Sequence, residues 1–149
     1  MRTKNRVLTL LAASALFTGS CLTLGATNAA AADWTFKKAG SETDGSFHIV
    51  AYNPSGEVAG TMDWDANPLP GGEPGDAFRV SDHLEDSWGM EATMTAPVAG
   101  LKATTRGQAA PYRSPWTRRD LREGTPVSIR LCAVRGTSSH CGGVYSGHA

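Results

Sequence analysis

Glycine and proline interrupt this chain so often that its regular structure must consist of short segments. The 149 residues include 17 glycines and 8 prolines, the two residue types that most weaken a helix interior. Beyond residue 32, no segment repeats apolar residues with the helical period of 3.6 over three turns. Apolar and polar residues instead alternate in several places, and this alternation favours β-strands.

The alternating segments predict an all-β fold. Residues 46–52 carry apolar side chains on one face, and a turn at 53–56 containing proline and glycine leads to a returning strand at 57–64. Residues 88–95 alternate in the same way, and residues 127–134 form the strongest strand pattern in the chain. Together with shorter segments, we expect a small antiparallel β-sandwich of about seven to eight short strands.

The first 32 residues have the pattern of an export signal. Three basic residues, Arg2, Lys4 and Arg6, precede an apolar run at 7–24, and an alanine-rich cleavage site ends at residue 32. We therefore predict a secreted, extracellular protein with a signal peptide at 1–32. A lipid anchor on Cys21 is a disfavoured alternative, because the leucine or similar residue expected three positions earlier is missing.

The two cysteines near the C-terminus, Cys132 and Cys141, are predicted to form a disulfide. Export places them in an oxidising compartment, where a single pair usually bridges. The loop between them contains glycine, serine and threonine, which suit a turn. We expect the bridge to hold a hairpin near its base, and the spacing argues against a metal site that includes His140.

Removal of residues 1–32 leaves a single-domain length, which we divide at residue 45. Residues 46–149 form the predicted β-sandwich domain. Residues 33–45 are polar apart from Trp34 and Phe36 and are predicted to be an edge strand or an N-terminal arm anchored by these two aromatic residues.

The charge balance argues against some partners. The whole chain has a formal net charge of zero, and residues 1–32 hold three basic and no acidic residues, so the remainder carries −3. A mildly acidic surface disfavours nucleic acid or an anionic membrane as the main partner after signal cleavage.

Acidic residues occur in two patterns that chemistry can use. Asp63 and Asp65 flank Trp64, so a strand places both carboxylates on one face, roughly 6–7 Å apart, a separation comparable to that in glycosidases.

Asp82, Glu85 and Asp86 surround His83 in a turn and offer oxygen ligands to calcium. A solvated strand face and a solvated turn explain both patterns equally well, and there is no Gly-x-Ser-x-Gly motif of a serine hydrolase. We predict no catalytic residue, no metal and no cofactor.

A proline-stiffened loop at 111–119 is the candidate interaction surface. Aromatic residues beside arginines are typical of interface hot spots, and the same aromatic rings can stack on sugars. The alternative is that Trp116 covers one end of the core. The residues of this surface are Tyr112, Arg113, Trp116, Arg118 and Arg119.

The second half of the chain carries a set of short motifs besides the Cys132–Cys141 loop. They are Val80-Ser81-Asp82, Asp86-Ser87-Trp88-Gly89-Met90-Glu91-Ala92, Thr105-Arg106-Gly107, Pro111-Tyr112-Arg113-Ser114-Pro115-Trp116 and Leu121-Arg122-Glu123-Gly124. With these motifs, residues 80–149 resemble small secreted proteins of streptomycetes and related actinobacteria. The resemblance implies export and a β-sandwich, with no catalytic residues to transfer.

We therefore predict a secreted, non-enzymatic protein that binds another extracellular protein or a glycan. One alternative is an adaptor subunit of a secreted toxin particle, similar to the umbrella toxins of streptomycetes, with residues 33–45 inserted into its partner. A second is a carbohydrate-binding module using Tyr112 and Trp116. A third is a small polysaccharide hydrolase using Asp63 and Asp65.

Overall fold

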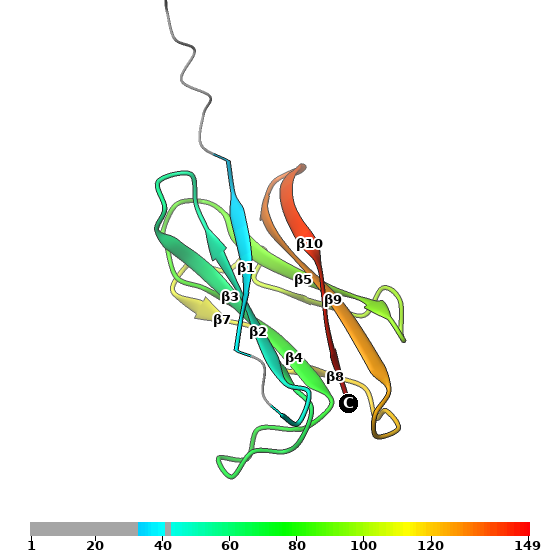
Figure 1. Cartoon of the computed structure of the whole chain (residues 1–149). Helices are drawn as coiled ribbons and strands as arrows, with labels where there is room; N and C mark the ends of the chain where they lie inside the picture. Colours follow the sequence, from blue (N-terminus) through cyan, green and yellow to red (C-terminus); the bar gives the residue numbers. More distant parts are fainter. Residues whose placement is uncertain (1–32, 41–42) are drawn as a thin grey trace, which may run out of the picture. The chain divides into compact units, whose positions relative to one another are not determined.

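The computed structural model describes residues 33–40 and 43–149, and over these residues the chain forms ten strands and no helix (Figure 1). The all-β prediction is confirmed, with more strands than the seven or eight expected. The predicted signal peptide at 1–32 lies outside the described residues, as do residues 41–42 of the predicted arm.

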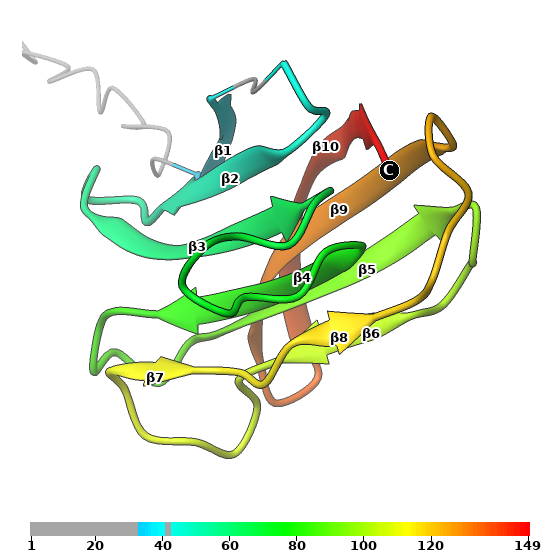
Figure 2. The ribbon, with the colours of Figure 1, turned by 90° about the horizontal axis from the view of Figure 1, so that it is seen from below.

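The strands form two antiparallel sheets that pack face to face (Figures 1 and 2). The first sheet has the order β1-β2-β3-β4-β7, and β8 also pairs with β4. Its strands are β1 Thr35–Ala39, β2 Phe47–Tyr52, β3 Val58–Asp65, β4 Ala77–Asp82, β7 Tyr112–Arg113 and β8 Thr117–Arg118. The second sheet has the order β10-β9-β5-β6. Its strands are β5 Gly89–Ala96, β6 Lys102–Thr104, β9 Pro126–Arg135 and β10 Ser138–His148.

Alternate side chains of both sheets fill the core between them, as the sequence pattern predicted. The inner face of β9 is fully buried, and so is that of β2. Trp64 of β3 is the largest fully buried side chain, and its indole Nε1 donates a hydrogen bond to the carbonyl oxygen of His148 at 3.2 Å. This bond satisfies the polar edge of the buried indole and ties the first sheet to the end of β10.

The predicted strand at 88–95 begins one residue later than expected. Met90, Ala92 and Met94 of β5 are fully buried, in agreement with the alternation. Trp88 has the same parity but precedes the strand, is half-buried and packs at the edge of the core. The largest side chain of this pattern therefore lies at one end of the sandwich.

Residues 35–39 form an edge strand. Strand β1 pairs with β2 along its whole length. Trp34 and Phe36 are half-buried and pack against the core. Two hydrogen bonds also join this segment to β10: Tyr145 Oη donates to the Phe36 carbonyl at 2.6 Å, and Lys38 Nζ donates to the Ser146 carbonyl at 2.6 Å. The two aromatic residues proposed as arm anchors therefore pack against the chain's own sandwich.

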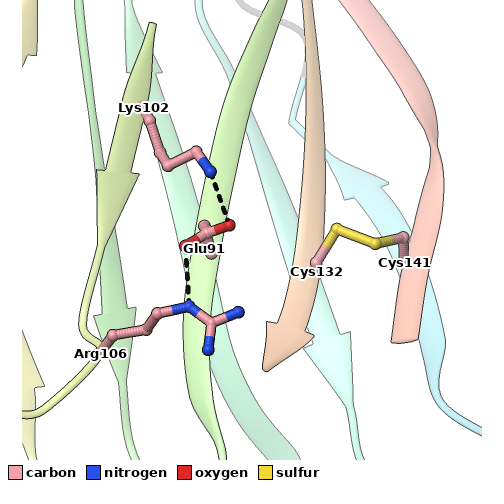
Figure 3. Close-up of a disulfide and its surroundings, with 5 residues drawn as sticks. All are labelled: Glu91, Lys102, Arg106, Cys132 and Cys141. Carbon is pink, nitrogen blue, oxygen red and sulfur yellow. Dashed lines mark hydrogen bonds and ion pairs between the residues drawn. A yellow bond between two sulfur atoms is a disulfide. The ribbon is translucent and has the colours of Figure 1, made fainter. Parts of the chain in front are cut away.

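The predicted disulfide is present and joins two strands of one hairpin (Figure 3). Cys132 of β9 and Cys141 of β10 are direct partners in the ladder, and the hairpin turns at residues 136–137. Because β10 already begins at Ser138, the bridge lies within the ladder and close to the hairpin tip, and the predicted position near the base is wrong.

Loss of the disulfide is expected to lower the free energy of unfolding by about 2–3 kcal/mol, because the bridge closes a loop of about ten residues in the unfolded chain. Urea denaturation with and without reductant measures this change. The Cys132→Ser/Cys141→Ser double variant is the control and should not respond to reductant. An unchanged denaturation midpoint after reduction of the wild-type protein would contradict a stabilising role.

Candidate ligand-binding site at one end of the sandwich

A cavity of about 620 Å³ opens at one end of the sandwich. Three connections contribute its lining: the β4–β5 loop, the β6–β7 loop and the β9–β10 turn. We call it the loop-end cavity. Its volume lies within the roughly 300–1,000 Å³ of sites that hold small ligands. Loops carried by a rigid sheet framework are also where binding residues most often occur.

Asp82 lines this cavity and is almost completely buried, with 4% of its surface exposed. It is the last residue of β4. Phe78 and Val80, four and two residues earlier in the same strand, are also buried and lie on the same face. The side chain of Asp82 therefore lies on the inner, core-facing side of the sheet, two residues beyond the apolar core positions. A carboxylate at such a position is costly unless other groups compensate its charge.

The protein itself compensates the negative charge of Asp82 only to a small extent. Its Oδ1 accepts one hydrogen bond, from the backbone amide of Leu84 at 3.3 Å. Burial raises the pKa of Asp82, and the negative charge of Asp86 raises it further, while the Leu84 hydrogen bond and the charge of His83 act in the opposite direction. The net effect is a raised pKa, the expected response of a buried acid whose charge is only partly compensated.

Beside Asp82, the space between the two sheets is tightly packed. Gly60 of β3 is the register partner of Asp82, and a Cβ atom at Gly60 would collide with the side chain of Met90 and the carbonyl oxygen of Ser81. Glycine is therefore required where the two sheets approach each other. Thr105, which also lines the cavity, accepts a hydrogen bond from the Met90 amide through Oγ1 at 2.8 Å and fixes the start of the β6–β7 loop.

Trp88 forms an aromatic wall of the loop-end cavity. Its backbone amide donates to Asp86 Oδ1 at 2.9 Å, and the preceding residue, Ser87, has a φ of 68°. Positive φ is unfavourable for serine, so the loop conformation that positions Trp88 carries local strain. The guanidinium of Arg135 lies over the indole ring, 4.4 Å from its centroid, in a cation–π contact.

Arg106, in the β6–β7 loop, links this loop to strand β5 and to the β9–β10 turn. Its Nε donates to Glu91 Oε2 at 3.0 Å (Figure 3), and its Nη1 donates to the Gly136 carbonyl at 2.9 Å. Lys102 donates to the other oxygen of Glu91, also at 3.0 Å. Burial alone would raise the pKa of Glu91, but the hydrogen bonds and charges of Lys102 and Arg106 outweigh it and lower the pKa. The charge of Arg106 is therefore already paired.

A second, smaller cavity of about 390 Å³ shares Trp88 with the first. Trp34 and His140 pack around Trp88, with ring centroids 5.3 and 5.2 Å from the Trp88 ring. Asp33, Asn53 and Asp86 supply polar groups to this cavity. Trp34 was predicted only as an anchor, and neither Trp88 nor His140 was predicted to belong to a binding site, because the three residues lie on segments far apart in the chain.

The residues of the candidate interaction surface at 111–119 lie along β4, with Tyr112 and Trp116 at different positions of this strand. Tyr112 and Arg113 form β7, which pairs with Ser81 and Asp82, and Tyr112 is half-buried beside a small cavity at that edge. Trp116 is half-buried elsewhere along β4, with the Arg79 guanidinium 4.0 Å from its ring centroid.

The two remaining arginines of that surface are exposed near residues 66–76. Arg118 pairs with Ala77 through β8, and the Arg119 amide donates to the Asp76 carbonyl at 3.1 Å. The five residues thus follow one edge of the sheet in sequence order.

The predicted carboxylate pair occupies the first sheet. Asp63 accepts a hydrogen bond from, or forms an ion pair with, His48 Nδ1 at 2.9 Å and lies 3.6 Å from Arg79 Nε. Burial would raise the pKa of Asp63, but these partners lower it, whereas burial and the charge of Asp63 raise the pKa of Asp65. Neither carboxylate lines the two cavities around Trp88.

The acidic residues of the turn at 82–86 lie in different environments. Asp82 is buried, while Glu85 and Asp86 are more accessible. Among residues 33–40 and 43–149, no group of three or more histidine, cysteine or acidic side chains is arranged to hold a metal ion. In the same part of the chain, no helix is long and apolar enough to cross a membrane.

Comparison of the chain with protein-family models, with curated proteins and with solved structures finds no match.

Substitution of Asp82 by asparagine is expected to raise the free energy of unfolding at pH 7 by roughly 0.5–2 kcal/mol, the range of single stabilising substitutions. A raised pKa in the folded state means that stability falls as the pH rises from the ordinary value of 3.8 through the folded pKa. Asparagine removes this cost and keeps an acceptor for the Leu84 amide. Denaturation between pH 3 and pH 8 measures the difference.

Asp63→Asn is the matched contrast. Its lowered pKa gives stability above the ordinary value of 3.8 that is lost as the pH falls through the folded pKa. This variant should be less stable at pH 7 by about 1 kcal/mol, because the uncharged amide no longer forms ion pairs with His48 and Arg79. A lower stability of Asp82→Asn at pH 7 would show that Asp82 is a structural residue compensated by the fold.

Proposed function

We propose that the protein is an extracellular, non-enzymatic β-sandwich that binds another molecule in the loop-end cavity. The observation that carries this proposal is Asp82, a buried carboxylate that accepts one hydrogen bond from the protein and lines a cavity of ligand size. Perturbed acids in concave sites are more frequent at functional sites than elsewhere. The disulfide and the signal pattern of residues 1–32 support an extracellular location.

The packing of the N-terminal strand bears on the toxin-adaptor alternative. In that alternative, residues 33–45 insert into a partner. Trp34 and Phe36 instead pack on the core of the same chain, and β1 is hydrogen-bonded to β2. Insertion would require β1 to leave the sheet, so the loop-end cavity is the better supported binding surface.

Carbohydrate binding is the second candidate function, and the Trp34–Trp88–His140 cluster favours it. Indole rings beside carboxylates and an asparagine side chain provide the apolar and polar contacts that a sugar ring uses. This cluster is an alternative to the pair Tyr112 and Trp116, which pack at different positions along β4. A glycan that binds there would contact the smaller cavity and the outer side of Trp88.

Indole NMR signals test the proposed binding surface. The chain has four tryptophans, of which Trp34 and Trp88 lie at the loop end, Trp64 is fully buried in the core and Trp116 packs on Arg79. Titration with neutral sugars, amines, carboxylates and short peptides should shift the Trp88 indole signal for at least one compound class and leave the Trp64 signal unchanged.

Two variants complete this test. Trp88→Ala should abolish binding of the responding compound, whereas Trp116→Ala, which removes an equally large half-buried ring on the first sheet, should retain it. Shifts that concentrate at Trp116 and survive Trp88→Ala would place binding on the edge surface at 111–119 and contradict the loop-end proposal.

A further inference from the structure

The hydrogen-bond donors and the positive charge that Asp82 lacks indicate the chemistry of the ligand. Among the described residues, its single hydrogen bond comes from the Leu84 amide to Oδ1, and no donor reaches its second oxygen. The residue nevertheless lies on the core-facing side of β4 with 4% of its surface exposed. A buried carboxylate gains most from a partner that brings both a hydrogen-bond donor and a positive charge.

The positive groups that line the cavity are already engaged. Arg106 pairs with Glu91 and with the Gly136 carbonyl. The guanidinium of Arg135 lies over the ring of Trp88. Glu85 adds a second acidic side chain to the lining. Asp82, in contrast, has no ion-pair partner among the described residues, so an anionic ligand group placed beside it would be repelled.

The walls of the cavity suit an aliphatic stem. Leu84, Trp88 and Val134 line the cavity together with Asp82 and contribute apolar surface to it. Lysine and arginine side chains combine such a stem with a terminal cation, and they bury the stem along apolar surface. The position of Arg135 also shows that the indole face of Trp88 accepts a guanidinium.

We propose that the loop-end cavity receives a lysine or arginine side chain of an extracellular polypeptide, with its terminal cation on Asp82 and its stem against Leu84 and Trp88. This inference rests on the proposed function and specifies the ligand class. A neutral sugar is the weaker candidate for this cavity, because it brings no charge to Asp82 and because Arg135 covers a face of Trp88.

The test uses small probes of matched size. Nα-acetyl-lysine N-methylamide and Nα-acetyl-arginine N-methylamide carry the proposed group. The norleucine derivative has nearly the same stem without the charge, and the glutamate derivative reverses the charge. NMR titration of the full chain should give shifts at Trp88 and Leu84 with at least ten-fold tighter binding of the basic probes than of the other two.

Asp82→Asn should weaken binding of the basic probes at least ten-fold, and Asp82→Glu, which keeps the charge, should retain part of it. Asp120→Asn is the control, because it removes the same charge from an exposed position beside a different cavity. It should leave binding unchanged. Thermal unfolding and the amide spectrum of each variant establish that its fold is intact.

The outcomes distinguish the two proposals. Equal binding of the lysine and norleucine probes, or undiminished binding by a folded Asp82→Asn variant, would overturn the assignment of a basic ligand. A response at Trp88 to neutral sugars alone would overturn that assignment and support the loop end as a binding site. No response at the loop end to any compound would overturn both.

Discussion

The packing of the two inner sheet faces around Trp64 is the constraint on which the rest of the structure depends. Trp64, Phe47 and Phe78 are fully buried from the first sheet and meet the buried methionines of β5 and the apolar face of β9. This contact requires a fixed alternation in each strand, since a slip of one residue would turn the apolar side chains outward. The position of every side chain at the strand ends follows from that register.

The loop-end cavity arises where this alternation continues beyond the core. Because alternate side chains of a strand face the same side, the register that buries Phe78 and Val80 also turns Asp82 inward. At this position the apolar packing ends and three connections meet. An apolar residue at position 82 would extend the core, whereas aspartate leaves a carboxylate that the fold compensates only weakly. Residues that reduce stability in this way are expected where a binding site needs them. Strain at Ser87 and the cation–π contact on Trp88 lie at the same end.

The sequence predicted the elements that depend on local pattern. The hairpin of β2 and β3 and the strong strand β9 follow from alternation and turn residues. The Cys132–Cys141 bridge follows from the export pattern and from the single pair of cysteines beyond residue 32. The short strands β7 and β8 could not be predicted, because they exist through pairing with β4 rather than through a pattern of their own. The cavity was missed for a related reason: Asp82, Trp88 and Arg106 converge only through the sheet order. The one available signal was the shared parity of Phe78, Val80 and Asp82.

The most direct test of this account is the pKa of Asp82 in the free protein, measured from the pH dependence of its side-chain carboxyl ¹³C signal. A weakly compensated carboxylate in the loop-end cavity requires a pKa above the ordinary value of 3.8. The signal of Asp63, which is held by His48 and Arg79, should titrate below that value in the same experiment. A pKa of Asp82 at or below 3.8 would show that the fold already compensates its charge, and would contradict the assignment of the loop-end cavity as a site awaiting a positively charged partner.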